Sequence, residues 1–309
     1  MTQQPLLKLG TRRSPLALAQ AEETRARLCA AHGWDSNAVE LVPVVASGDK
    51  VQDRALAEIG GKALWTKELD AWLAEGHIDA SVHSMKDVET IRPESLAIAA
   101  ILPRADKRDR LIGASGIADL PEGATVGTSA PRRAAQLLNL RPDCRVVTFR
   151  GNVATRLAKL EAGEADATFL AAAGLSRLGQ DEVGVALEPE DWLPAPAQGA
   201  IGVECRSDDT RVRDLLSVLD HAPSRAEVMA ERALLLALGG TCHSPIAVRC
   251  DFANDQLAMR AVLFSPAGQE RVEAKDHFRA GNTDAPARLA EMLLAKATSG
   301  ITAVFDGPQ

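Results

Sequence analysis

Apolar and polar positions alternate along the first third of the chain in a pattern that predicts strands followed by helices. Strands are expected at residues 6–10, 38–46, 78–85 and 96–102. A helix is expected from Ser14 to about Ala31, since serine caps helix starts and the following proline suits the first turn. A second helix is expected where one apolar face is formed by Trp65, Leu69, Trp72 and Leu73. This order predicts a mainly parallel sheet covered by helices.

The same pattern starts again after residues 103–110, a polar and charged crossing that we interpret as a hinge. Further strands are expected at residues 124–129, 145–149, 166–171 and 200–205, with helices from about 130 and 153. After residues 221–224 the pattern changes to a helix, short strands and a final helix around Leu289 and Leu293. We therefore expect two similar α/β lobes followed by an α+β tail.

The amino-acid composition excludes some classes of protein but does not indicate a function. With 46% hydrophobic and 25% charged residues the chain is an ordinary globular protein, and its net charge of −7 and 3% aromatic content argue against nucleic-acid binding. The five cysteines include no C-x-x-C pair, which predicts neither a disulfide framework nor a zinc site or other metal site. No secretion signal and no run of 18 apolar residues is found, so we expect a cytoplasmic protein without a membrane segment.

Arginines recur where strands give way to helices, in the stretches "GTRRSP", "GTSAPRR" and "FRGNVATR". Cations are disfavoured at a helix start, where exposed amide groups already attract anions. Their repeated presence there predicts a ligand with several carboxylates or phosphates, bound at the carboxyl ends of the strands. No glycine-rich phosphate loop is found, so a nucleotide is not favoured. The arginines concerned are Arg12, Arg13, Arg132, Arg133, Arg150 and Arg156.

Two further residues are candidates for chemistry. Asp87, in "HSMKDV", follows a predicted strand; such a residue is usually only a solvated strand end, but among arginines it would stay ionised. It could then stabilise a transient cation or transfer a proton. Cys242, in "LGGTCHSPI", lies in a glycine-rich loop; a lone cysteine is usually an inert small side chain. His243 is expected to point away from its neighbour Cys242, which argues against a Cys–His nucleophile.

Taken together, these stretches resemble the porphobilinogen deaminase family, also called hydroxymethylbilane synthases, of tetrapyrrole biosynthesis. The resemblance covers essentially the whole chain and rests on motifs in the expected order. They are "TRRSPLALAQ", "GGKALWTKEL", "HSMKDV", "VGTSAPRR", "RGNVATRL", "AAAGLSRLG", "LPAPAQGAIGVECR" and the loop around Cys242.

The resemblance implies a fold of three domains. Two α/β lobes would resemble those of periplasmic binding proteins, with mixed, mainly parallel sheets and the active cleft between them. Residues 1–102 with 199–220 would form the lobe that carries the catalytic aspartate, and residues 103–198 the arginine-rich lobe. Residues 221–309 would form a smaller α+β C-terminal domain that carries the cofactor cysteine.

The resemblance also implies an activity and a covalent cofactor. The family's enzymes are transferases of heme (porphyrin) biosynthesis that deaminate porphobilinogen and join four molecules head to tail on a dipyrromethane primer. Water then releases the linear hydroxymethylbilane. The primer is bound through a thioether to a cysteine whose position corresponds to Cys242. The resemblance therefore implies that Cys242 carries the cofactor and is not an inert side chain. We expect a monomer whose partner is porphobilinogen, without nucleic acid or membrane.

Site residues follow from the same correspondence. Asp87 matches the catalytic aspartate, and the acidic side chains of each pyrrole ring explain the need for cations. The cofactor would be held by Ser84, Lys86, Thr128, Ser129, Arg132 and Arg133, with Gln198 supporting the cleft. Incoming substrate or the growing chain would be held by Arg12, Ser14, Arg150, Arg156 and Arg177.

Some positions depart from the family pattern. Ala63 and Ala197 stand where family members usually have glycine. Glu58 lies in a charged segment, residues 47–63, that we interpret as a lid. In family members this segment is often more basic. Two other functions stay open from the residues alone. A solute-binding protein of the same architecture would carry no covalent pyrroles, and a cysteine-dependent hydrolase would lose activity on alkylation of its cysteine.

Overall fold

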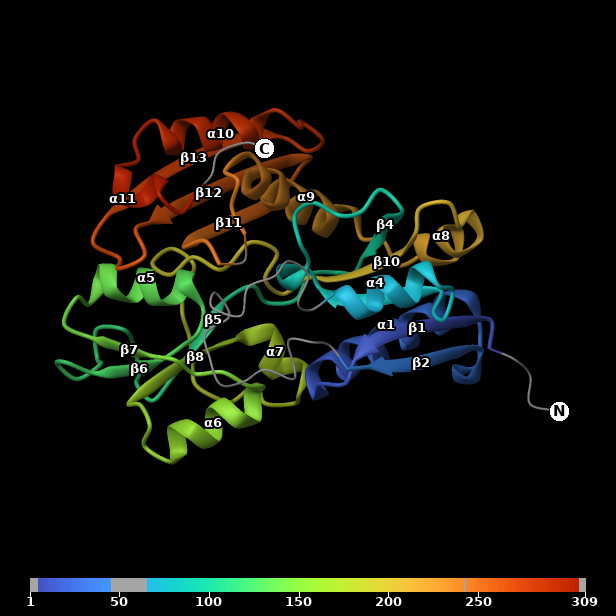
Figure 1. The fold of residues 1–309 in the computed structure, drawn as a ribbon, viewed down its shortest axis with the longest axis horizontal. Coiled ribbons are helices and arrows are strands. Elements are labelled where there is room, and N and C mark those ends of the chain that lie inside the picture. The colour runs from blue at the N-terminus through green and yellow to red at the C-terminus, as the bar shows by residue number, and fades with distance from the viewer. Residues whose placement is uncertain (1–4, 46–65, 242, 306–309) are drawn as a thin grey trace. The chain divides into compact units, whose positions relative to one another are not determined.

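The computed structural model of the chain describes residues 5–45, 66–241 and 243–305 (Figure 1). These residues form two compact units, and each is treated by itself below. The first unit comprises the described residues of Met1–Gln52, Gly61–Ala105 and Ala200–Arg225. The second comprises those of Asp106–Gly199 and Ala226–Gln309.

The first unit is built on a five-stranded sheet with the spatial order β2-β1-β3-β10-β4. Strands β1 to β3 are parallel to one another, whereas β10 is antiparallel to both β3 and β4, so four strands point the same way. The strands are β1 (Leu7–Arg12), β2 (Val39–Val44), β3 (Ala80–Ser84), β4 (Leu96–Ile101) and β10 (Ile201–Arg206).

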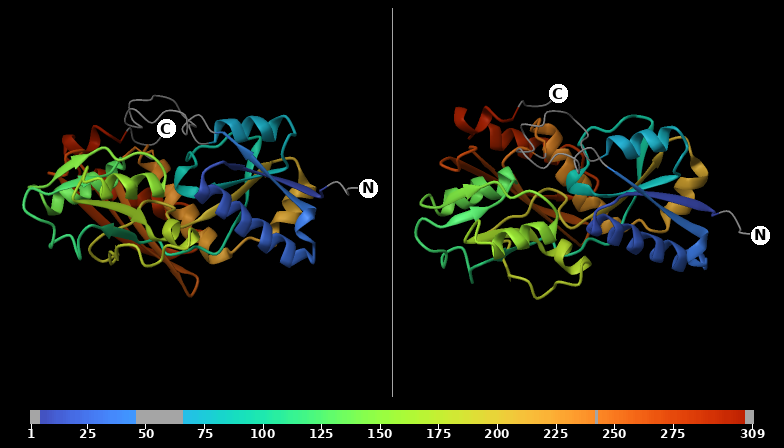
Figure 2. Two further views of the ribbon diagram at one scale, coloured as in Figure 1. Left: turned by 90° about the horizontal axis from the view of Figure 1, so that it is seen from below. Right: turned by 60° about the horizontal axis from the view of Figure 1, so that its bottom comes forward.

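Helices cover both faces of this sheet. Helix α1 (Pro15–His32) and helix α8 (Thr210–Ser217) share one apolar cluster with the strands, which includes Leu9 and Val203. Helix α4 (Lys67–Ala74) forms a separate cluster on the other face, and Figure 2 shows α1 in blue and α4 in cyan on opposite sides of the sheet. The described part of this unit also contains two short 3-10 helices, η1 (Ser36–Ala38) and η2 (Met85–Asp87).

The second unit contains a sheet of the same plan, in the order β7-β6-β8-β5-β9. Strands β6 to β8 are parallel, and β5 is antiparallel to both β8 and β9. The strands are β5 (Asp109–Ile112), β6 (Thr125–Gly127), β7 (Arg145–Val147), β8 (Ala167–Ala171) and β9 (Val185–Ala186). Helices α5 (Pro131–Leu140), α6 (Val153–Glu161) and α7 (Ala172–Arg177) follow β6, β7 and β8.

A smaller antiparallel sheet follows in the C-terminal part of the chain, in the order β11-β12-β13. Its apolar face packs on α9 and α10 in one cluster that includes Leu234, Met259 and Leu289. Its other face meets α5 through a second cluster, which includes Ala135 and Val262. The elements are α9 (Ala222–Ala237), β11 (Ile246–Ala253), β12 (Gln256–Phe264), β13 (Arg271–Arg279), α10 (Ala285–Leu294) and α11 (Ser299–Thr302).

The predicted fold class is confirmed: two α/β sheets in which most strands point the same way are followed by a smaller α+β part. Strand β5 was not predicted. It begins at Asp109, near the end of the polar stretch 103–110, and Asp109 is buried despite its charge. Trp65, expected on a helix face, lies outside the described residues, and α4 begins at Lys67.

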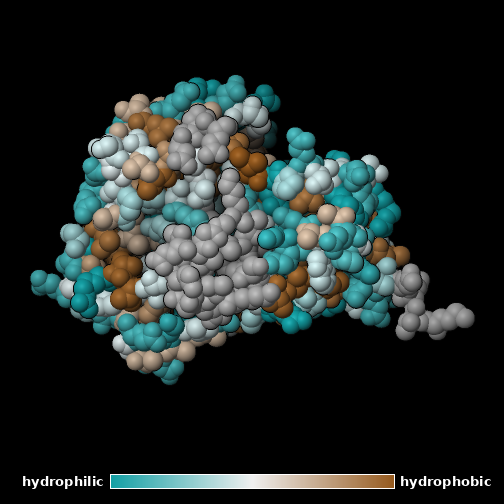
Figure 3. Space-filling view, in the orientation of Figure 1, coloured by the Kyte–Doolittle hydropathy of each residue, from teal (hydrophilic) through white to brown (hydrophobic). Residues whose placement is uncertain are grey.

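Hydrophilic residues predominate on the surface shown in Figure 3, where apolar residues form small separate groups. Among the described residues, no helix combines the length and apolar character that crossing a membrane requires.

Candidate functional site

Asp87 lies in a tight turn at the carboxyl end of β3, in the first unit. The turn begins at Met85, whose amide donates to the Ala200 carbonyl at 3.0 Å. The buried Met85 side chain lies against Gly202, where an added Cβ would stand 2.0 Å from the Met85 sulfur. A side chain at position 202 would displace the Met85 side chain, so glycine suits this position beneath the turn. Lys86 and Asp87 are partly exposed at the strand end.

Three other predicted residues of the first unit lie at carboxyl ends of parallel strands. Arg12 is the last residue of β1, and Ser14 caps α1 by accepting a hydrogen bond from the Ala17 amide at 3.3 Å. Ser84 ends β3, the neighbouring parallel strand, and accepts a hydrogen bond from the buried Gln20 amide at 2.8 Å. Strand order thus brings these side chains to the same edge of the sheet as Asp87.

The second unit has a buried carboxylate at the corresponding edge. Asp109, the first residue of β5, is 0% exposed. Its Oδ2 accepts from Arg132 Nη1 at 2.6 Å and from Trp192 Nε1 at 2.8 Å, and its Oδ1 accepts from Arg133 Nη2 at 2.7 Å and Gln198 Nε2 at 2.8 Å. Burial disfavours the charged form of Asp109, yet Arg132 and Arg133 hold its pKa far below the usual value.

Asp109 thus joins three of the predicted cofactor-binding residues in one buried network. Arg132 and Arg133 together carry one more charge than Asp109 neutralises. Each also has a buried Nε with no hydrogen-bond partner among the described residues. Buried donors with excess positive charge suit an anionic group, so these residues fit carboxylates such as those of a dipyrromethane.

Asp109 is the residue that sequence reasoning missed. It lies in "DKRDR", where its neighbours are charged and a solvated crossing is the natural interpretation. A signal was available, since two arginines at a helix start that are buried need a counter-ion nearby. The sequence alone does not say which acidic residue supplies it.

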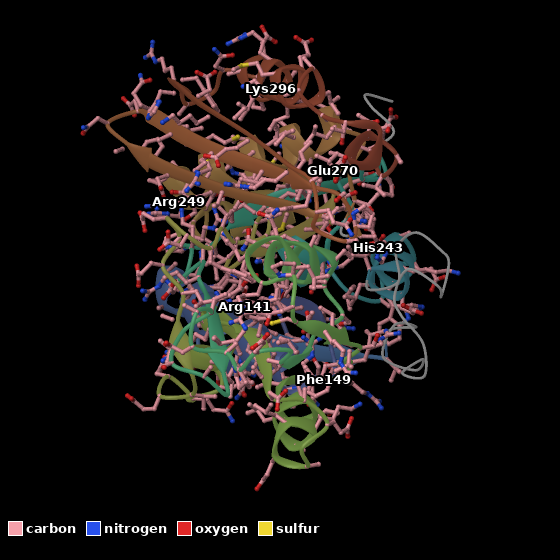
Figure 4. The ribbon with its side chains drawn as sticks, turned by 90° about the vertical axis from the view of Figure 1, so that its left-hand side faces the viewer. Arg141, Phe149, His243, Arg249, Glu270 and Lys296 are labelled. Atoms are coloured by element: carbon pink, nitrogen blue, oxygen red, sulfur yellow. The ribbon has the colours of Figure 1, made fainter. Side chains whose placement is uncertain are left out.

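Other predicted residues of the second unit lie at the carboxyl ends of its parallel strands. Thr128 follows β6, and its hydroxyl accepts from the Ala130 amide at 3.2 Å, with Ser129 half-buried between them. Arg150 follows β7 and is largely buried. Its neighbour Phe149, labelled in Figure 4, packs closely on Gly127 of β6, where any side chain would clash with the Phe149 ring. This close contact fixes where the chain turns toward α6.

Two more arginines hold backbone carbonyls near this edge. Arg156, in the first turn of α6, donates from Nε to the Gly151 carbonyl at 3.1 Å. Arg177 ends α7, which follows β8, and donates from Nη2 to the Gly199 carbonyl at 3.1 Å. The helices that follow three parallel strands therefore each bring predicted anion-binding residues to the same edge of the sheet.

The return segment from the second unit contains a backbone conformation that alanine rarely adopts. Ala197 has φ 58°, and its amide donates to Glu231 Oε2 at 2.6 Å. The next residue, Gln198, donates both to Asp109 and to the Lys107 carbonyl. The positive φ favours glycine at position 197, because an L side chain is strained there.

Cys242, Glu58 and Ala63 lie outside the described residues. On either side of Cys242 the loop is tight, since the Ser244 hydroxyl accepts from the Thr241 amide at 3.0 Å. Burial lowers the pKa of His243, which follows Cys242 and is labelled in Figure 4. Among the described residues, no cluster of three His, Cys, Asp or Glu side chains could hold a metal ion.

The other four cysteines are buried thiols. They are Cys29, Cys144, Cys205 and Cys250. Burial raises the pKa of Cys205 to about 11, which keeps that thiol protonated and unreactive near neutral pH.

Two α/β lobes with cations at the carboxyl edges of their sheets are typical of proteins that bind acidic small molecules. Comparison with known families identifies the particular family. The family model for the dipyromethane cofactor binding domain of porphobilinogen deaminase matches residues 7–214, and that for its C-terminal domain matches residues 225–295. The chain belongs to the porphobilinogen deaminase family.

Curated relatives agree with this assignment. The chain is 53% identical over 305 residues to porphobilinogen deaminase of Sphingopyxis alaskensis, covering 97% of this chain and 96% of the relative. It is 50% identical over 282 residues to porphobilinogen deaminase of Paracoccus denitrificans, covering 89% and 90%.

Solved structures that resemble the chain include a periplasmic domain and a substrate binding domain. The periplasmic VFT2 domain of Bordetella pertussis BvgS has a TM-score of 0.39 at 17% identity, covering 74% of this chain and 93% of that chain. The second substrate binding domain of a putative amino acid ABC transporter from Streptococcus pneumoniae has a TM-score of 0.41 at 10% identity, covering 68% and 89%.

Proposed function

We propose that this protein is a hydroxymethylbilane synthase, a transferase that deaminates porphobilinogen and joins four molecules into a linear chain that water releases. The observation that supports this most strongly is the family match over residues 7–214 and 225–295, which includes every predicted site residue. The geometry within each unit is compatible with it. The first unit places the Asp87 carboxylate at a strand end, and the second gathers arginines at the corresponding edge.

Substrate binding is proposed for the cations at the strand ends. Arg12, with the nearby Ser14 hydroxyl, would bind the acidic side chains of the pyrrole in the first unit. Arg150, Arg156 and Arg177 would do so in the second. Guanidinium groups bind carboxylates through paired hydrogen bonds, so they would orient each ring as well as attract it.

Cofactor binding is proposed for Cys242, through a thioether, and for polar residues of both units. They are Ser84, Lys86, Thr128, Ser129, Arg132, Arg133 and Gln198. When bound, a dipyrromethane supplies the free ring position that attacks the incoming unit. Arg132 and Arg133 would hold its carboxylates in place, and Asp109 would keep both guanidinium groups oriented while Gln198 fixes Asp109.

Asp87 is proposed as the catalytic residue. Loss of ammonia from porphobilinogen leaves a cationic, electrophilic pyrrole. A fixed carboxylate that accepts hydrogen bonds from pyrrole N–H groups would stabilise that positive charge. The same carboxylate could take the proton that is lost when the new bond forms, and both roles need it ionised and held in place.

Several coarser features complete the proposal. We propose three domains, comprising residues 1–102 with 199–220, residues 103–198 and residues 221–309. We further propose that the protein acts as a cytoplasmic monomer in heme biosynthesis and binds neither nucleic acid nor membrane.

Incubation with porphobilinogen tests the proposed reaction. Consumption of porphobilinogen with equimolar release of ammonia and formation of a linear tetrapyrrole is the expected result. Porphobilinogen that is bound but recovered unchanged would instead indicate a solute-binding protein.

A further inference from the structure

Arg92 is a largely buried cation five residues beyond Asp87, and no role proposed above uses it. Its side chain is 9% exposed. Its Nε and Nη2 donate to the two carboxylate oxygens of Glu204 on β10, at 2.9 and 3.0 Å. Glu204 is fully buried and also contacts His83 on β3, with 3.2 Å between Oε2 and Nε2. Arg92 is thus anchored to the centre of the sheet that carries Asp87.

Arg92 also forms hydrogen bonds with two further segments of the first unit. Nη1 donates to Glu89, two residues after Asp87, at 2.7 Å. Nη2 donates to Asp70 in the first turn of α4 at 2.6 Å, and Thr66, just before that helix, donates to Glu89 at 2.9 Å. One guanidinium therefore joins the segment that leaves the Asp87 turn to β10 and to α4.

The start of the turn is fixed by different contacts. Met85 is held by its amide bond to Ala200 and by its close packing on Gly202. Within the turn, the Val88 amide donates to the Met85 carbonyl at 3.3 Å, which is long for such a bond. On the far side, the Arg92 network attaches the segment among the described residues, and without Arg92 the carboxylates of Asp70, Glu89 and Glu204 would face one another.

We propose that Arg92 is a positioning residue for Asp87, which it serves by fastening the segment after the turn to β10 and α4. The proposal rests on the catalytic role proposed for Asp87. Misplacing a reacting group by about 1 Å costs roughly 10²-fold in rate, whereas binding of the substrate's carboxylates by distant arginines would be unaffected. Loss of Arg92 should therefore appear in kcat rather than in KM.

The test compares Arg92→Gln and Arg92→Lys with a matched control, Arg206→Gln. Arg206 also lies in the first unit and holds the Leu73 and Ile78 carbonyls and Asp209, away from the Asp87 turn. We expect Arg92→Gln to lower kcat by about 10- to 100-fold with KM changed less than about threefold. Lysine keeps the charge but cannot make the paired hydrogen bonds of a guanidinium group, so Arg92→Lys should lower kcat less than Arg92→Gln does.

Hydrogen exchange supplies a readout that does not depend on activity. Exchange of the Val88 amide should accelerate in Arg92→Gln and stay unchanged in Arg206→Gln. Equal losses of kcat in Arg92→Gln and Arg206→Gln, or a normal kcat in Arg92→Gln, would overturn the positioning role. Unchanged Val88 exchange in Arg92→Gln would overturn it independently. A wild-type protein that leaves porphobilinogen intact would overturn the proposed function instead.

Discussion

The two five-stranded sheets share one plan, and each buries a carboxylate on its antiparallel strand, but at different heights. Asp109 is the first residue of β5 and pairs with Ala171, the last residue of β8, at the carboxyl edge of the parallel strands. Glu204 lies deeper in its sheet, because it pairs with Ser81 near the start of β3.

This difference in height determines which cations each carboxylate organises. Asp109 meets the first turn of α5, where Arg132 and Arg133 stand at the edge that binds ligands in such sheets. Glu204 meets Arg92, which holds the segment beyond the Asp87 turn. The buried anion of the second unit thus orients groups that we propose to bind ligand, and that of the first unit holds the segment beyond the turn that we propose to be catalytic.

Replacing Asp87 with asparagine should break the chemistry of the first lobe and leave the second intact. Asparagine has the same size but no charge, so we expect turnover to fall roughly 10²- to 10⁴-fold while the protein folds and keeps its covalent pyrroles. Steady-state kinetics and intact mass provide the check. A turnover like that of the wild type would refute the role of Asp87.

Replacing Asp109 with asparagine should break the second lobe through its stability. Two buried guanidinium groups would lose their counter-ion, and we expect the free energy of unfolding to fall by about 3–5 kcal/mol. Chemical denaturation measures this.

The control for that variant is Asp143→Asn, which removes the ion-pair partner of Arg141 (labelled in Figure 4), a partly exposed pair in the same unit. Exposed ion pairs contribute little, so its loss should be much smaller. Equal losses in the two variants would contradict the role given to Asp109.

The stability that Glu204 contributes should depend on pH. Burial favours its neutral form, yet His83 and Arg92 lower the pKa of Glu204 from 4.5 to about 2. A depressed pKa means that the contribution is complete above pH 4.5 and is lost as pH falls toward 2, and it amounts to at most about 3 kcal/mol. The stability difference between wild type and Glu204→Gln should therefore shrink across this range. A difference that stays constant between pH 7 and pH 3 would exclude this linkage.

The smallest expected effect concerns the return segment that carries Gln198. Ala197→Gly should relieve the positive φ, and we expect the free energy of unfolding to rise by up to about 1 kcal/mol. A thermal melting curve measures this, with Ala195→Gly, two residues earlier and without a positive φ, as the control that should not be stabilised. A loss of stability in Ala197→Gly would show that the alanine side chain contributes more than its backbone strain costs.

Much of the fold could be predicted from the sequence because its signals are local. Periodic apolar residues and the cap at Ser14 indicated α1, and the pattern around Leu69 indicated α4. Strand β5 was missed because its first residue, Asp109, is a charged group whose burial depends on arginines more than 20 residues away. Contacts across a sheet leave no periodic trace in one sequence.

The candidate site likewise combines residues that a local sequence pattern indicates with residues that it does not. Arginines at helix starts indicated anion binding, since a cation there is locally unfavourable. Asp109 and Arg92 gave no local signal, because each acts on residues that the fold brings to it. Cooperative ion networks of this kind become visible only when the strand order is known.

The intact mass of protein purified from cells that make porphobilinogen tests the central claim most directly. The account predicts a mass above that of the polypeptide by two pyrrole units in the wild type, and the bare polypeptide mass in Cys242→Ser. A bare polypeptide mass in the wild type, or an equal addition in both proteins, would contradict it.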